Sequence, residues 1–195
     1  FSTVNGIQLF PELIRAHCSI VGIWGNASKN GKLLQLRTLD WDSSAPMNGF
    51  PTAVIYKSTE PGSQVFANFG WAGMIGSLAG YSGKIGVSEA DWLPDLDNQT
   101  TIFGQPWMYV LRDVLQFGTD LNSAIGILQN AVRTYKVYLG IGSGVDNRLT
   151  GVQYQAINIT LYSDKNWSKP FSPVHPQMDG VMYWDKSASQ NRPCF

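Results

Sequence analysis

Three polar side chains near the N-terminus have the types and the spacing that a thiol nucleophile requires. Cys18 begins an apolar, alternating segment, and Arg37 and Asp40 lie three residues apart on the next such segment. A neutral thiol is a weak nucleophile, so it needs a cation that favours the thiolate and a base that accepts and returns the proton. An α-amino group can be that base. The pattern therefore predicts a catalytic cysteine supported by a guanidinium and a carboxylate.

A β-hairpin is the element that has to position these residues. Residues 19–24 alternate and are rich in Ile and Val, residues 33–39 form a second apolar segment, and a polar turn separates the two. With the turn centred near Lys29, the register places Cys18 opposite Asp40. We therefore expect the thiol and the carboxylate to be cross-strand neighbours.

The rest of the chain reads as sheet with one pair of helices. Pro106 suits the first turn of a helix that Gly118 ends, and Thr119 caps a second helix whose apolar stripe runs as far as Val132. Further strands are expected at 53–56, 65–69, 85–88, 137–141, 153–161 and 181–183. The helix pair should cover a sheet, which gives an α+β fold.

Composition indicates one globular domain that acts on a small molecule. The chain has 195 residues, 44% of them hydrophobic, which suffices for one substantial core. Lys plus Arg and Asp plus Glu both number 14, without blocks of like charge, so no nucleic-acid partner is expected. No apolar run is long enough to span a bilayer.

Several features suggest a lysosomal or secreted protein. Glycosylation sequons lie at Asn26, Asn98, Asn158 and Asn166. The chain has two cysteines, so Cys18 could instead form a disulfide with Cys194 in an oxidising compartment. That structural interpretation competes with the nucleophile hypothesis.

Two segments around the candidate nucleophile carry a family resemblance. Cys-Ser-Ile-Val-Gly at 18–22 and Leu-Gln-Leu-Arg-Thr-Leu-Asp-Trp at 34–41 resemble the acid ceramidase and penicillin acyltransferase branch of the N-terminal-nucleophile hydrolases. The likeness covers roughly residues 10 to 186 and includes segments at 69–73, 80–88 and 104–106. It implies an αββα sandwich of antiparallel sheets flanked by helices, incomplete in this chain.

The resemblance also implies roles for individual residues. Autocatalytic cleavage between His17 and Cys18 would make Cys18 the N-terminal nucleophile and its own amine the general base. Asp40 would hold that amine, and Arg37 would support both the thiolate and Asp40. Residues 1–17 would then be the tail of a pro-segment and residues 18–195 the catalytic domain, lacking its C-terminal part. No metal or organic cofactor is implied.

The sequence departs from the family pattern near its end. The family stabilises the oxyanion with an Asn on a late strand, whereas this strand offers Tyr183 or Trp184. The family sandwich also continues past the point where this chain stops. A companion chain from the same precursor is therefore expected, and Cys194 could form a disulfide with it.

The function expected from these observations is hydrolysis of an amide-linked fatty acyl group, such as an N-acyl sphingoid base. Aromatic side chains could line a groove for this lipid substrate, although most aromatics in such a chain belong to its core. The candidates are Trp41, Trp71, Tyr81 and Tyr183. Two rivals stay open: a phospholipase B-like acyl-ester hydrolase, and a non-catalytic glycoprotein that keeps the scaffold.

Overall fold

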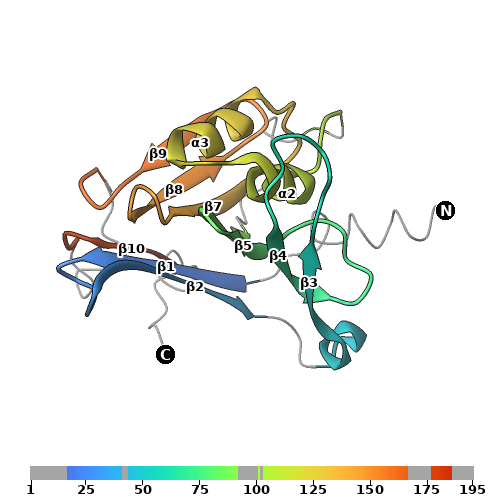
Figure 1. Cartoon of the computed structure of the whole chain (residues 1–195), viewed down its shortest axis with the longest axis horizontal. Coiled ribbons are helices and arrows are strands. Elements are labelled where there is room, and N and C mark those ends of the chain that lie inside the picture. The colour runs from blue at the N-terminus through green and yellow to red at the C-terminus, as the bar shows by residue number, and fades with distance from the viewer. Residues whose placement is uncertain (1–16, 41–43, 92–100, 102, 167–176, 186–195) are drawn as a thin grey trace.

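The computed structural model contains two antiparallel sheets that face each other, with two helices on the outer face of the larger one (Figure 1). It describes residues 17–40, 44–91, 101, 103–166 and 177–185. We call the three-stranded sheet the small sheet and the seven-stranded sheet the large sheet. The α+β sandwich expected from the sequence is thereby confirmed.

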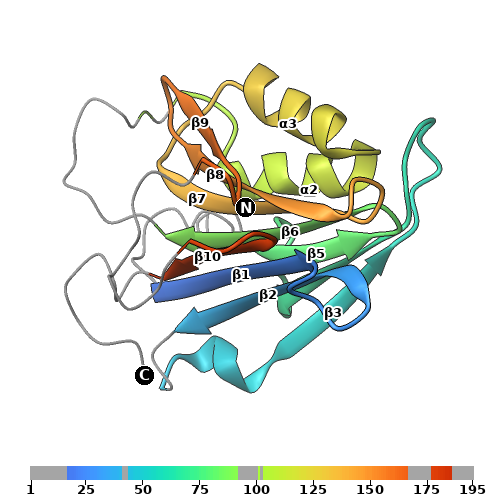
Figure 2. The ribbon, with the colours of Figure 1, turned by 90° about the vertical axis from the view of Figure 1, so that its left-hand side faces the viewer.

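The small sheet holds the candidate nucleophile. Its strands follow the order β10 (Val181–Asp185), β1 (His17–Gly25) and β2 (Gly31–Asp40), and Figure 2 shows them side by side. The predicted hairpin is confirmed as β1 and β2. Its turn uses Gly25 and Gly31 with positive φ angles of 57° and 71°, which glycine adopts without steric cost.

The large sheet is a meander in which each strand pairs with its neighbours in sequence. Its strands are β3 (Pro51–Tyr56), β4 (Phe66–Trp71), β5 (Ala79–Ser82), β6 (Ile85–Asp91), β7 (Val137–Ser143), β8 (Arg148–Tyr154) and β9 (Ile159–Tyr162). A short 3-10 helix, η1 (Pro46–Gly49), lies between β2 and β3 in the chain. The prediction of a single strand at 153–161 is wrong. This segment contains a hairpin turn at 155–158, in which the Gln155 N–H donates to the Asn158 carbonyl at 3.0 Å.

The helices α2 (Trp107–Phe117) and α3 (Leu121–Asn130) connect β6 to β7 in the chain and pack on the large sheet. The predicted end of the first helix at Gly118 is confirmed. The predicted cap at Thr119 is one residue early: the Asp120 carboxylate accepts the Ser123 N–H at 2.8 Å in a capping box. Val132 lies beyond α3 and is exposed, so the helical stripe is shorter than predicted.

Glycines let the two sheets approach each other closely at two points. A Cβ built on Gly22 of β1 would come within 2.7 Å of Leu149, and one on Gly140 of β7 within 2.7 Å of Ile20. The absence of side chains there lets the sheets close over a small apolar cluster that contains Cys18, Ile20 and Leu149. The candidate nucleophile is therefore held in the interface between the sheets.

Among the described helices, none has the length and apolar character needed to cross a membrane.

Candidate active site

Cys18 lies near the start of β1 with its side chain between the two sheets. Only 1% of its surface is exposed, and it packs with Ala90 of β6 and Met182 of β10. Strand alternation explains the placement, because Cys18 and Ile20 point to the same face and both are buried. The thiol is thus fixed by rigid strands.

Arg37 connects the thiol to a buried carboxylate. Its Nη2 donates to Cys18 Sγ at 3.3 Å and to Glu89 Oε2 at 2.5 Å, and its Nε donates to the Glu89 carbonyl at 3.0 Å. The side chains of Arg37 and Glu89 are only 9% and 5% exposed. One guanidinium therefore binds both the candidate nucleophile and an anchoring carboxylate across the gap between the sheets.

Burial shifts the pKa values of Arg37 and Glu89. Burial raises the pKa of the Glu89 carboxyl, and the nearby Arg37 offsets only part of that effect. Burial by itself lowers the pKa of Arg37, but the charges and hydrogen bonds of Glu89 and Cys18 together raise it above its ordinary value. Arg37 therefore stays a cation next to the thiol, where it favours the thiolate.

Glu89 was not among the site residues predicted from the sequence. Its predicted strand stopped at Ser88, and no pattern linked Glu89 to Arg37, which lies 52 residues earlier. The sequence does contain one indication: Glu89 lies within an apolar strand, and an acidic residue that is buried there has to be paired with a cation or be neutral.

The predicted register of the hairpin is wrong by one residue. Cys18 pairs with Leu39, and Asp40 pairs with His17, because the turn is centred at Ser28, with Gly25 opposite Gly31, and not at Lys29. The irregularity between Ile23 and Gly25 offsets only part of this difference. Asp40 is exposed, so its carboxylate and the Cys18 side chain lie on opposite faces of the small sheet. Arg37 binds Cys18 and Glu89, and Glu89 takes the place expected for Asp40. The role of Asp40 in holding the Cys18 amine stays a prediction.

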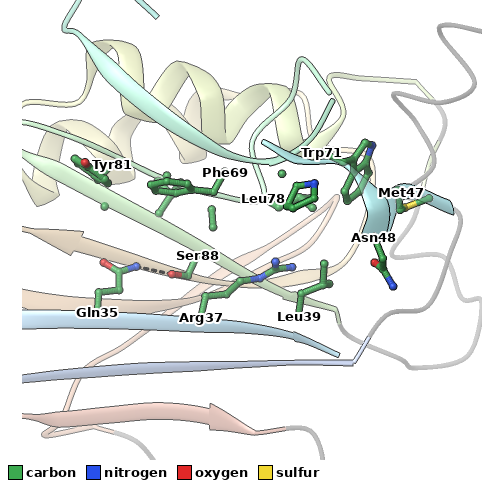
Figure 3. A pocket seen from close by; sticks show the side chains of 16 residues that line it. Gln35, Arg37, Leu39, Met47, Asn48, Phe69, Trp71, Leu78, Tyr81 and Ser88 are labelled. Carbon is green, nitrogen blue, oxygen red and sulfur yellow. Dashed lines mark hydrogen bonds between the residues drawn. The ribbon is translucent and has the colours of Figure 1, made fainter. Parts of the chain in front are cut away.

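A groove of about 570 Å³ opens beside Arg37 (Figure 3). One wall is β2, with Gln35, Arg37 and Leu39, and the facing wall is the β4–β6 part of the large sheet. The groove is mostly apolar, with the polar side chains of Arg37, Gln35, Ser88 and Asn48 at intervals. Its size and lining suit a small lipid-like ligand.

The predicted substrate-binding aromatics are distributed unevenly around this groove. Trp71 and Tyr81 line it, with 8% and 57% of their surfaces exposed. Tyr183 is not among the lining residues and lies opposite Val21 on β10. Trp184, the other residue considered at the oxyanion position, stacks on Tyr138 with ring centroids 3.5 Å apart. Trp41 lies outside the described residues.

His17 and Cys18, which flank the predicted cleavage site, are consecutive residues of β1. Residues 1–16 and Cys194 lie outside the described residues, so the pro-segment and disulfide predictions are not tested. Within the described part, no group of His, Cys, Asp and Glu side chains could hold a metal ion.

Three of the four predicted glycosylation sites lie on the described surface. Asn26 is exposed in the β1–β2 turn, Asn158 is exposed in the turn before β9, and Asn166 is exposed after β9. Asn98 lies outside the described residues. Glycosylation and the lysosomal or secreted location stay predictions.

Comparison with solved structures identifies the class of fold. A Caenorhabditis elegans N-acylethanolamine-hydrolyzing acid amidase ortholog matches 86% of this chain and 69% of its own chain, with a TM-score of 0.62. The chain thus shares the fold of this acid amidase. The sequence identity is 13%, so the likeness concerns the fold alone.

Comparison with curated proteins identifies two relatives in Dictyostelium discoideum. Protein dcd1B is 36% identical over an alignment of 199 positions that covers 100% of this chain and 40% of that protein. Protein dcd1A is 34% identical over an alignment of 196 positions that covers 95% of this chain and 44% of that protein. The chain spans less than half the length of these relatives. No family model matches it.

Proposed function

We propose that this protein is a cysteine-nucleophile hydrolase that cleaves an amide-linked fatty acyl group, in the manner of acid ceramidase-like proteins. The observation that carries the proposal is the 3.3 Å contact between the Arg37 guanidinium and Cys18 Sγ beside a largely apolar groove. An apolar groove suits the acyl chain, and a buried guanidinium favours the reactive form of the thiol.

The proposed reaction begins with activation of the chain. Cys18 Sγ attacks the carbonyl carbon of His17, the peptide C–N bond breaks as the nitrogen gains the thiol proton, and water hydrolyses the resulting thioester, which frees the α-amino group and the thiol of Cys18. That amine takes the proton of the thiol, and Cys18 Sγ attacks the carbonyl carbon of the substrate. The C–N bond then breaks, the amine leaves with a proton, and the acyl group remains on sulfur as a thioester. Water hydrolyses the thioester to the free acid and restores the thiol.

Burial of the thiol supports the activation step. In the uncleaved chain Cys18 is 1% exposed, and it is not among the residues that line the groove, whereas Arg37 is. A substrate carbonyl in the groove would therefore meet Arg37 before it met the sulfur. Cleavage before Cys18 would let the new N-terminus move and open the thiol to the groove.

Hydrolysis of a long-chain N-acyl amide by the purified protein at mildly acidic pH tests the proposal. The released fatty acid is measured for the wild type and for Cys18→Ala. We expect Cys18→Ala to lose at least about a thousandfold in rate, since the nucleophile and its amine act as a unit. Cys194→Ala is the matched control, because it removes the other of the two cysteines.

The same experiment separates the rival functions. Release of fatty acid from the matching ester and not from the amide would favour the phospholipase B-like function. A folded, cleaved wild type that hydrolyses neither substrate would contradict catalysis and favour a non-catalytic scaffold. The amide is the first substrate to try, because the acid amidase with the same fold is described as N-acylethanolamine-hydrolyzing.

A further inference from the structure

Strand β2 carries Arg37 but lies at the edge of the small sheet. In the part of the chain that the structure describes, β2 pairs with β1 on one side only. An edge strand leaves one row of its backbone groups outside the ladder, so contacts with the facing sheet have to hold it in place. Arg37 spans that gap to reach Glu89, and its Nη2 also lies 3.3 Å from Cys18 Sγ. The geometry at the thiol therefore depends on what fixes β2 to the large sheet.

The start of β2 is held by Asn147, which lies in the turn between β7 and β8. Its side-chain amide accepts from the Leu33 N–H at 2.8 Å and donates to the Gly31 carbonyl at 2.7 Å. Asn147 has a φ of 52°, in the left-handed region that few residues other than glycine adopt. The amide thus pairs with two backbone groups of β2, much as a neighbouring strand would. Beyond Leu33, another contact has to hold the stretch that carries Arg37.

Gln35 supplies that contact, two residues before Arg37 on the same face of β2. Its Nε2 lies 2.8 Å from Ser88 Oγ on β6 and 3.1 Å from the Gly140 carbonyl oxygen on β7. Since a carbonyl oxygen can only accept, the amide nitrogen has to face Gly140. Figure 3 shows the Gln35 side chain beside Arg37, in contact with Ser88. One amide therefore ties the edge strand to two strands of the facing sheet.

The large sheet is shaped to receive this amide. A Cβ on Gly86 would come within 2.7 Å of Gln35 Oε1, and a Cβ on Gly142 would also collide with it. A Cβ on Gly140 would lie 3.7 Å from Gln35 Nε2. Glycine weakens the interior of a strand, and it often marks a place where another group approaches closely. Three glycines on two paired strands therefore form a socket for the end of one side chain from the other sheet.

We infer that Gln35 is a positioning residue, which holds β2 against the large sheet so that the Arg37 guanidinium stays in contact with the Cys18 thiol. The bonds from Arg37 to the Glu89 carboxylate are charge-assisted and stronger than the bond to sulfur. If the small sheet moved away at this point, the guanidinium would stay with Glu89 and its contact with sulfur would lengthen. Gln35 acts through Arg37 and takes no part in bond breaking. This inference rests on the proposed function, because it treats the thiol as the nucleophile.

Titration of the Cys18 thiol tests this role without any substrate. The ultraviolet absorbance of the thiolate is followed against pH, and the titration of Cys18→Ala is subtracted. Gln35→Met keeps the length of the side chain but has no hydrogen to donate to Ser88 or Gly140. We expect the thiol of Gln35→Met to titrate about one pH unit higher than that of the wild type, because a more distant cation favours the thiolate less.

A second variant disturbs the same contact from the other sheet. Gly86→Ala places its Cβ against Gln35 Oε1, at the flexible end of that side chain, and should displace the amide with the same effect on the titration. Gly83→Ala is the matched control, because a Cβ there meets open space, and it should leave the titration unchanged. Near-ultraviolet circular dichroism shows whether each variant is folded.

Arg37→Met separates a positioning role from a merely structural one. In this background Gln35→Met should cause no further shift, because the cation through which Gln35 acts is gone. A titration that is unchanged in folded Gln35→Met and Gly86→Ala, or a shift that persists without Arg37, would overturn the inference. Amide hydrolysis is measured separately. Its absence from a wild type whose thiol titrates as expected would contradict the proposed function and leave the role of Gln35 at the thiol standing.

Discussion

At the scale of single residues, the site depends on a charge pair buried between two sheets. Arg37 and Glu89 join β2 to β6, and the same guanidinium holds Cys18 Sγ. The nearness of Cys18 and Arg37 was predictable, because a hairpin brings its two strands together. The contribution of Glu89 was not, since it depends on how the two sheets stack and not on local sequence.

Glu89 gives the protein a testable pH dependence. Burial raises the pKa of its carboxyl above the ordinary value of 4.5, so the folded chain keeps this proton at pH values where the unfolded chain has lost it. The folded state then binds more protons, and the free energy of unfolding falls as the pH rises from about 4.5, by at most about 1.4 kcal/mol per pH unit. Glu89→Gln cannot titrate and lacks this contribution.

Urea unfolding of the wild type and of Glu89→Gln, measured in parallel from pH 4 to pH 7, checks the sign. We expect the stability of the wild type relative to the variant to decrease as the pH rises. An advantage of the wild type that grows with pH would show that Arg37 lowers the pKa of Glu89 more than burial raises it.

At the scale of elements, hydrophobic alternation predicted the hairpin, and turn residues predicted its position. The one-residue error in register came from the turn, which is centred at Ser28 and not at Lys29, and which the irregularity between Ile23 and Gly25 offsets only in part. That single shift pairs Leu39 with Cys18 and puts Asp40 on the exposed face. The hairpin was predictable, and the face of the sheet on which the Asp40 carboxylate lies was not.

Gly22 is the residue at which this element should be most sensitive to change. A Cβ there would meet Leu149 Cβ at 2.7 Å, close to the backbone of the facing sheet, so Gly22→Ala should lower stability by about 1–3 kcal/mol. Gly126→Ala is the matched control, because Gly126 lies in α3 with open space around its Cβ and should gain up to about 1 kcal/mol. Urea unfolding measures both. Equal stability of Gly22→Ala and the wild type would contradict the close contact between the sheets.

At the scale of the whole molecule, the sandwich of sheets was predictable from alternating strands and two amphipathic helices. The groove was not, because its walls come from strands distant in sequence, such as β2 and β4. On the outer face of the small sheet, Leu34 and Leu36 are 52% and 54% exposed. The Dictyostelium relatives are more than twice as long as this chain. These two leucines alternate with the inward residues that form the site.

The proposed function requires Cys18 to become an N-terminal nucleophile, and intact-mass and N-terminal analysis tests this step. The purified wild type and Cys18→Ala are incubated side by side at mildly acidic pH. We expect the wild type to lose residues 1–17 and begin at Cys18, and Cys18→Ala to stay intact. A wild type that stays uncleaved under these conditions, or a Cys18→Ala chain that is cleaved at the same bond, would contradict it.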